Sequence, residues 1–250
     1  MSDLLVNTVP DLVDNEMGYT LGLFLHGNEL ENVRSLVKTQ WLENLKKHAP
    51  EHLEKILEYD LPRYHEISSL VNHALIWPKI NRILPKDAVD YIRSTSLVKS
   101  LEEHYGEFII SDEEEIGREE IYWRLVRPNE SSDMGPLHAD AWFWELGHGN
   151  TQEGFRRVKV WVALYCQPGK NGLRIVPGSH KGEWPYHGEE RNGFVKPQID
   201  VDENDLPVEL VYTKPGDAIV FHDRLLHGGA PNNANTTRVS LEFTMFVKNA

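Results

Sequence analysis

The sequence is almost without cysteine, because Cys166 is the only one among its 250 residues. A single thiol cannot form a disulfide within the chain, so a disulfide-stapled secreted scaffold is excluded. Zinc and iron–sulfur sites that depend on several thiolates are excluded for the same reason. We therefore expect any bound metal ion to be held by histidine and carboxylate side chains.

Long apolar runs and basic residues are also scarce. No uninterrupted stretch approaches the ~20 apolar residues that a membrane-spanning helix needs, and the first residues do not resemble a signal peptide. The 26 basic residues are outnumbered by 39 acidic ones, which gives a net charge of −13. Nucleic acids and anionic membranes favour a basic surface. We therefore expect a cytoplasmic protein that acts on a small molecule, with no nucleic-acid or membrane partner.

The chain changes character near residue 120. Apolar residues recur every three or four positions in 29–49, and further helices are expected over 51–59 and 86–105. The acidic run at 111–120 is expected to be a solvated loop, because charges of one sign repel each other. Strands are predicted where β-branched and aromatic residues gather, namely over 121–127, 138–146, 157–165, 173–176, 207–212, 218–223 and 238–247.

Strands that follow a block of helices predict an α+β fold that is mainly β. The expected architecture is a β-sandwich or jelly roll with helices packed on one side. Residues 1–118 contain too few core positions to fold separately. We therefore expect one domain over residues 1–250, with a largely helical part at 1–118 and a β core at 119–250.

The first candidate site lies in residues 136–144. On a strand, His138, Asp140, Trp142 and Trp144 share one face. A histidine and an aspartate two positions apart can reach one metal ion. A second histidine would complete the facial triad of non-haem Fe(II) oxygenases, which leaves coordination positions open for oxygen and a co-substrate. The alternative is a hydrogen-bonded surface pair without a metal.

Two histidines compete for the third ligand position. His222 and His227 are five residues apart, so on an unbroken strand they point to opposite faces. Gly228 and Gly229 follow His227 and leave space beside an ion, which favours His227. His222 stays open as the alternative ligand, and His180 is expected to be a turn residue beside the site.

A possible carboxylate clamp follows on the last strand. Arg238, Ser240 and Glu242 share a face, and an arginine with a serine two positions later can bind a carboxylate through a guanidinium fork and a hydroxyl donor. The alternative is the solvent face of an edge strand. Glu242 lies on the same face, and a buried carboxylate there needs a partner.

The order and spacing of these motifs, with Asn-Gly-Leu-Arg-Ile-Val-Pro-Gly-Ser-His at 171–180, resemble the phytanoyl-CoA dioxygenase family. The resemblance covers residues 121–247 in detail. It implies a double-stranded β-helix, a jelly-roll or cupin-like core with an N-terminal helical layer. It also implies an Fe(II)/2-oxoglutarate-dependent dioxygenase that consumes O2, releases succinate and CO2, and hydroxylates an unactivated C–H bond.

The same resemblance assigns roles to individual residues. It implies that His138, Asp140 and His227 bind the iron, and that Arg238, assisted by Ser240, binds the distal carboxylate of 2-oxoglutarate. Relatives that halogenate carry a small residue where this family has the carboxylate. The presence of Asp140 therefore disfavours halogenation.

Several residues near the expected cavity keep two interpretations. Lys159 either contacts 2-oxoglutarate or an anionic substrate, or it points outward along its apolar stem. Trp142 either stacks on the substrate or packs the barrel. Arg124 and Arg127 lie on opposite strand faces, so at most one of them faces the cavity, and Arg127 is the candidate substrate residue.

Three functions are compatible with these motifs. The first is hydroxylation of a small polar or anionic metabolite. The second uses the same cofactors for desaturation, cyclisation or oxidative cleavage. The third is a metal-binding β-barrel without catalysis, acting as a sensor or scaffold. An intact triad together with a clamp favours the enzymes, because a non-catalytic barrel needs no co-substrate site.

Overall fold

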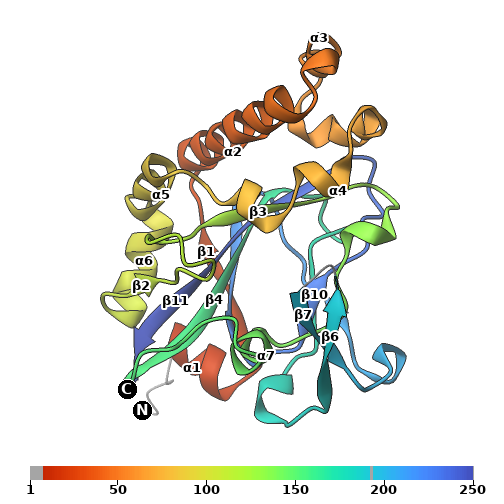
Figure 1. Cartoon of the computed structure of the whole chain (residues 1–250). Helices are drawn as coiled ribbons and strands as arrows, with labels where there is room; N and C mark the ends of the chain where they lie inside the picture. Colours follow the sequence, from red (N-terminus) through yellow and green to blue (C-terminus); the bar gives the residue numbers. More distant parts are fainter. Residues whose placement is uncertain (1–7, 192–193, 250) are drawn as a thin grey trace.

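The computed structural model describes residues 8–191 and 194–249 as three antiparallel sheets with a layer of helices (Figure 1). The large sheet has the order β1-β9-β4-β11-β2, and β3 also pairs with β11. Its strands are β1 (Tyr19–Phe24), β2 (Ile109–Ile110), β3 (Tyr122–Val126), β4 (Phe155–Tyr165), β9 (Asp217–His222) and β11 (Arg238–Lys248).

Two smaller sheets lie on the other side of the large sheet (Figure 1). One has the order β10-β5-β8 and is built from β5 (Leu173–Ile175), β8 (Glu209–Leu210) and β10 (His227–Gly229). The other is a hairpin of β6 (Tyr186–Arg191) and β7 (Phe194–Ile199). Facing antiparallel sheets form the predicted jelly-roll core.

Side chains of the two long strands alternate between two environments. On β4, Val158, Val160, Val162 and Leu164 join the core beneath the helices, whereas Trp161 and Ala163 pack toward β5. On β11, the residues from Val239 to Val247 at every second position belong to the same helix-side core. The polar residues Arg238, Ser240, Glu242 and Thr244 therefore occupy the inner face, as their spacing predicts.

The helices cover the outer face of the large sheet (Figure 1). They are α1 (Val9–Asn15), α2 (Gly27–His48), α3 (Leu53–Ile56), α4 (His73–Ile76), α5 (Lys86–Arg93) and α6 (Ser96–Tyr105), joined by loops and short 3-10 turns. The apolar stripe of α2, including Val37 and Trp41, is buried in one core with Val160 and Phe243 of the sheet. Helices and sheet thus bury a shared apolar interior. In the described part of the chain, no helix is both long and apolar enough to cross a membrane.

Four expectations about local structure are wrong. Residues 86–105 form two helices, because the hydroxyls of Ser94 and Thr95 donate to the carbonyls of Tyr91 and Ile92 and end α5. The predicted strand 207–212 shortens to β8, and the region 51–59 forms a 3-10 turn and the one-turn α3.

The fourth error concerns residues 138–146, which do not form a strand. His138 makes a single bridge to His227, and the chain then turns into α7 (Asp140–Glu145). Tertiary packing decides this segment: Trp142 is buried against Tyr186 with nearly parallel rings, 4.4 Å apart. Aromatic residues favour strands because their side chains pack well on a pleated surface. Here Trp142 finds its packing partner from a helix, so the strand is not needed.

Candidate metal centre

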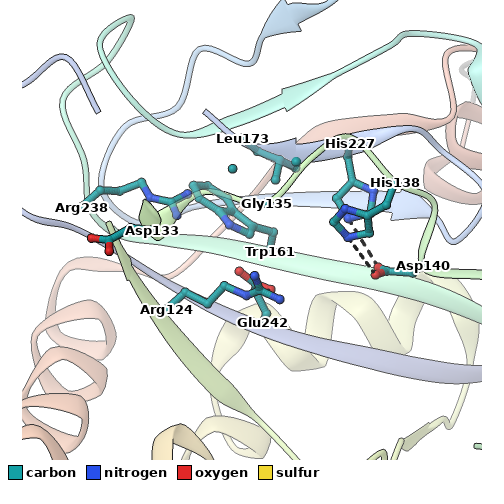
Figure 2. A pocket seen from close by; sticks show the side chains of 12 residues that line it. Arg124, Asp133, Gly135, His138, Asp140, Trp161, Leu173, His227, Arg238 and Glu242 are labelled. Carbon is teal, nitrogen blue, oxygen red and sulfur yellow. Dashed lines mark ion pairs between the residues drawn. The ribbon is translucent and has the colours of Figure 1, made fainter. Parts of the chain in front are cut away.

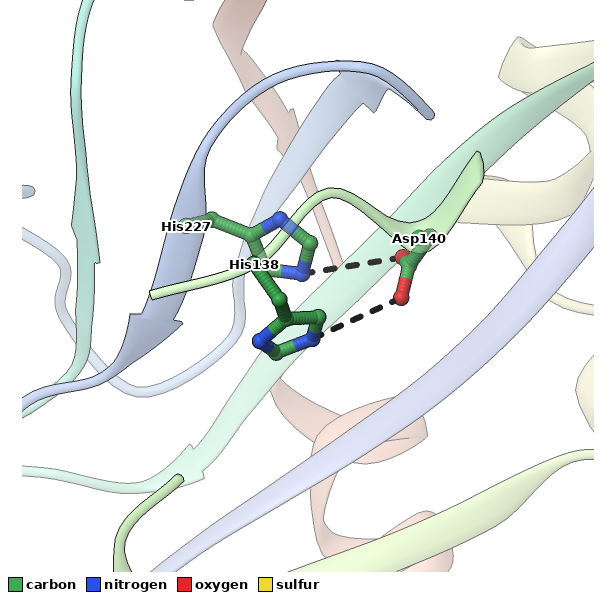
Figure 3. A group of neighbouring side chains, drawn as sticks. All are labelled: His138, Asp140 and His227. Carbon is green, nitrogen blue, oxygen red and sulfur yellow. Dashed lines mark ion pairs between the residues drawn. The ribbon is translucent and has the colours of Figure 1, made fainter. Parts of the chain in front are cut away.

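His138, Asp140 and His227 meet at the inner face of the large sheet (Figure 3). The two histidines are joined by their backbones, since each amide donates to the carbonyl of the other at 3.0 and 2.9 Å. Nε2 of His138 lies 3.7 Å from Oδ1 of Asp140, and Nε2 of His227 lies 3.6 Å from Oδ2. The three ligand atoms lie within 4.8 Å of one another, so one metal ion can contact all of them.

The remaining ring nitrogen of each histidine faces a backbone carbonyl. Nδ1 of His138 lies 3.0 Å from the oxygen of Pro136, and Nδ1 of His227 lies 2.8 Å from that of Leu225. A carbonyl only accepts hydrogen bonds, so each Nδ1 carries the proton and the neutral ring presents a bare Nε2. Burial lowers the pKa of His227 to about 4. Both features are those of metal-binding histidines.

Asp140 supplies the negative charge. Burial alone would raise its pKa, but Lys159 and the two histidines outweigh burial and hold the pKa of Asp140 well below its usual range. Its Oδ2 is buried and has no hydrogen-bond partner among the described residues. An anionic oxygen without a hydrogen bond beside two bare imidazole nitrogens fits a divalent metal ion, and the donor set of two histidines and one carboxylate suits Fe(II).

Arg238 lines the same pocket as the triad, together with Trp161 and Leu173 (Figure 2). Only 2% of Arg238 is exposed. One guanidinium nitrogen donates to the carbonyl of Gly172 at 2.9 Å, and Nε has no partner. No carboxylate of the described residues forms an ion pair with Arg238, and burial lowers its pKa to about 10. A buried cation without a counter-ion, facing the triad, fits the carboxylate of a ligand.

Glu242 has the partner that a buried carboxylate requires. Its Oε2 lies 3.1 Å from Nε of Arg124, and both side chains line the pocket. Register explains the contact, because Arg124 on β3 lies opposite Ser240 on β11. The Ser240 hydroxyl donates to Oε1 of Glu242 at 3.3 Å. Of the two arginines on β3 and at its end, Arg124 is therefore the one that lines the pocket.

Arg127 and Trp142, the candidate substrate residues, lie outside the pocket lining. The Arg127 guanidinium donates twice to the carboxylate of Asp133, at 2.9 and 2.7 Å, and it is Asp133 that reaches the pocket. Trp142 packs on Tyr186. Their contact with a substrate stays a prediction.

His222, which competed with His227 for the third ligand position, lies beside His180. The rings of His222 and His180 lie 5.2 Å apart. Nδ1 of His222 accepts from the amide of Arg224, and Nε2 of His180 lies 3.2 Å from the carbonyl of Asp14. Neither belongs to the triad.

Lys159 points inward, as its face shared with Trp161 predicts. Its Nζ lies 3.6 Å from Oδ2 of Asp140 and 3.7 Å from Oε1 of Glu113. Glu113 comes from the acidic run 111–120, which is therefore not a solvated loop throughout. Glu113 is half-buried, and Glu120 is buried at 1% exposure. Lysines from other elements neutralise the acidic side chains of this run. The sequence does not show these contacts, because they depend on the tertiary structure.

The comparisons with known proteins agree with this geometry. The family model described as phytanoyl-CoA dioxygenase (PhyH) matches residues 33–240. This range is more than half of the chain, so the chain belongs to the phytanoyl-CoA dioxygenase family. No curated protein matches the sequence.

Solved structures of the same fold share little sequence with the chain. The non-haem monooxygenase ThoJ is 18% identical with a TM-score of 0.56, over 96% of this chain and 76% of ThoJ. EctD from S. alaskensis, solved with bound Fe, is 14% identical with a TM-score of 0.56, over 99% and 79%. The carbocyclase SnoK from nogalamycin biosynthesis is 14% identical with a TM-score of 0.53, over 98% and 85%.

Family and site together define the class of protein. The chain is an Fe(II)/2-oxoglutarate-dependent oxygenase that uses O2, built on a jelly-roll core. The matched range contains the triad, Arg238 and Ser240.

Proposed function

We propose that this oxygenase hydroxylates an unactivated C–H bond of a small polar or anionic metabolite, with release of succinate and CO2. In this proposal His138, Asp140 and His227 hold Fe(II), and Arg238 binds the distal carboxylate of 2-oxoglutarate. The observation that carries it is one pocket holding an Asp140 oxygen without a hydrogen bond, two bare Nε2 atoms and an arginine with no counter-ion among the described residues.

Residues of the chain have separate tasks in this reaction. When bound, the iron with 2-oxoglutarate and oxygen supplies the oxidising chemistry. The carbonyls of Pro136 and Leu225 fix the histidine tautomers. Arg238 fixes the far end of the co-substrate, and Trp161 walls the pocket and excludes water from the reacting centre.

The polar substrate class is supported by the cations around the pocket. Arg127 donates twice to Asp133, which lines the pocket, and Arg156 donates twice to Asp14, which does not. Arg124 differs, because it lines the pocket and keeps 44% of its side chain exposed. Together with Glu242 it offers a substrate both a donor and an acceptor.

Anaerobic titration of the metal-free protein with Fe(II) and 2-oxoglutarate tests the proposal. We expect a weak metal-to-ligand charge-transfer band in the visible spectrum, lost in His138→Ala and Asp140→Ala and kept in His222→Ala. His222 is the matched control, because it is the other histidine considered for the third ligand position and lies outside the triad. Admission of O2 should then yield succinate.

Two results would contradict the assignment. A band that survives in Asp140→Ala would remove that carboxylate from the triad. Iron binding without a band in the wild-type protein would favour the non-catalytic metal-binding barrel.

A further inference from the structure

Beside Asp140, a row of charged side chains alternates in sign, and each has a quarter or less of its side chain exposed. It runs from Asp140 to Lys159, Glu113 and Lys79. Nζ of Lys159 lies 3.6 Å from Asp140 and 3.7 Å from Glu113, and Nζ of Lys79 lies 2.7 Å from the other oxygen of Glu113. The four side chains come from α7, β4, the loop 111–121 and a 3-10 turn. Their meeting is therefore a product of the fold.

Lys159 is held tightly in this row. It is 4% exposed, and its Nζ also lies 3.2 Å from the hydroxyl of Thr244 and 3.3 Å from that of Tyr122. The Thr244 hydroxyl in turn donates to Glu113 at 2.7 Å. Among the described residues, Asp140 and Glu113 are the carboxylates within ion-pair distance of Lys159. The ammonium is thus shared between a metal ligand and one remote acid.

We infer that Lys159 is a positioning residue for Asp140, and that Glu113 holds the Lys159 ammonium in place through their ion pair. The inference rests on the proposed function, because it takes Asp140 as an iron ligand. The ammonium lies 3.6 Å from Oδ2 of Asp140, the oxygen that also faces His227, and so fixes the orientation of the carboxylate toward the metal. Glu113 cancels the charge of Lys159, which would otherwise compete with the metal for Asp140 and repel a dication nearby.

The inference assigns the acidic loop an indirect effect on the metal site. Glu113 never touches a ligand of the metal. Its effect passes through Lys159, so its loss should matter only while Lys159 is present. This dependence separates a positioning role from a general loss of packing.

The test measures Fe(II) affinity anaerobically, without 2-oxoglutarate, by competition with a chromophoric chelator. Glu113→Gln keeps the shape of the side chain and an oxygen for Thr244, but leaves Lys159 with Asp140 as its remaining anion. We expect affinity to fall roughly ten- to a hundred-fold. Lys159→Met should bind Fe(II) at least as tightly as the wild type, because a nearby positive charge is gone. The double variant should match Lys159→Met.

Glu114→Gln is the matched control. Glu114 is the neighbouring residue and contacts Lys79 at 3.1 Å, but it forms no ion pair with Lys159, so Fe(II) affinity should stay unchanged. Co(II) bound in place of iron reports on the residues that bind the metal through its visible absorption spectrum. Its visible bands should change in Lys159→Met, because the Asp140 carboxylate then loses the contact that orients it.

Three outcomes would overturn the inference. Glu113→Gln could bind Fe(II) as the wild type does. It could weaken binding equally with and without Lys159, which would show an action independent of Lys159. Lys159→Met could weaken 2-oxoglutarate binding with unchanged Fe(II) affinity and Co(II) spectrum, which would show a contact with the co-substrate.

Two further comparisons keep the test decisive. If Glu113→Gln does not fold, Glu113→Asp replaces it in the test. This variant keeps the negative charge but moves the carboxylate away from Lys159 by one methylene. An unchanged Fe(II) affinity in Glu113→Asp would also overturn the inference. Failure of the proposed function looks different, since wild-type protein and His138→Ala would then bind Fe(II) alike.

Discussion

The surroundings of Arg238 indicate a bound ligand more directly than those of any other residue discussed above. It is buried, lines the triad's pocket and has no carboxylate partner among the described residues. We expect Arg238→Met to weaken 2-oxoglutarate binding by about 2–5 kcal/mol, roughly thirty-fold or more in Kd, because a carboxylate would then be buried without its partner. Fe(II) affinity in the absence of 2-oxoglutarate should not change. Calorimetric titration of each ligand separates the two effects.

Arg156→Met provides the control for this prediction. Its guanidinium donates to both oxygens of Asp14, at 2.7 and 2.8 Å, away from the pocket. Binding of 2-oxoglutarate should be unaffected there. If both variants lose affinity equally, Arg238 acts through the stability of the fold and not as a clamp.

At the same scale, the sequence indicates which side chains of the triad lie together better than it indicates the residues around them. His227 is preferred over His222 because two glycines follow it, and the structure brings His227 to Asp140 and leaves His222 beside His180. The contact between Lys159 and Glu113 has no local signal. It depends on a loop folding against a strand more than forty positions later, which periodicity and spacing do not describe.

At the scale of helices and strands, the alternation of inward and outward side chains along a strand is predictable where each face of the strand has a defined environment. The inward and outward positions of β4 and β11 follow from their sequences, because helices cover one face and the pocket occupies the other. The segment after His138 shows the limit of this reasoning. Its aromatic residues suit a strand, yet they pack as helix α7 on the β6–β7 hairpin.

Helix α2 gives a test of how the helical layer supports the sheet. Trp41 is fully buried on its inner face, with its ring 6.3 Å from that of Tyr64. Trp41→Ala should lower the free energy of unfolding by about 3–5 kcal/mol, because a large cavity is left in the core. Trp41→Phe should cost less, since the indole Nε1 has no hydrogen-bond partner to lose. Urea unfolding measures both variants.

The exposed Glu43 on the same helix is the control. Glu43→Ala should leave the free energy of unfolding within about 0.5 kcal/mol of the wild type. Fe(II) affinity of folded Trp41→Ala protein should stay near the wild-type value, because α2 lies on the face of the sheet away from the triad. A loss from Trp41→Ala no larger than that from Glu43→Ala would show that α2 contributes little to the core.

On the scale of the whole molecule, the buried acids of residues 111–120 make stability depend on pH. Glu120 is 1% exposed, and its Oε1 accepts from the amide of Glu114 at 2.7 Å while Oε2 has no hydrogen-bond partner. Burial raises the pKa of Glu120 to about 7 from an ordinary 4.5. The folded protein therefore keeps a proton that the unfolded chain releases between these two values.

The sign of the effect follows from this difference in bound protons. Between about pH 4.5 and pH 7 the folded state binds more protons at Glu120, so its contribution to the free energy of unfolding falls as pH rises. The total loss is at most about 3 kcal/mol. The lowered pKa of His227 acts in the opposite direction below pH 6.5 in the metal-free protein. The pH profile of the wild type alone therefore mixes the two contributions.

Glu120→Gln isolates the contribution of the acid, because glutamine stays neutral at every pH and resembles the protonated side chain. Urea unfolding of metal-free protein at pH 5 and pH 7.5 should show the variant gaining stability relative to the wild type at the higher pH. The gain should be of the order of 1–3 kcal/mol, with the two proteins close together at pH 5. Profiles that run parallel across this range would show that Glu120 is already ionised in the fold, and that Lys79, 3.7 Å away, neutralises it as fully as it does Glu113.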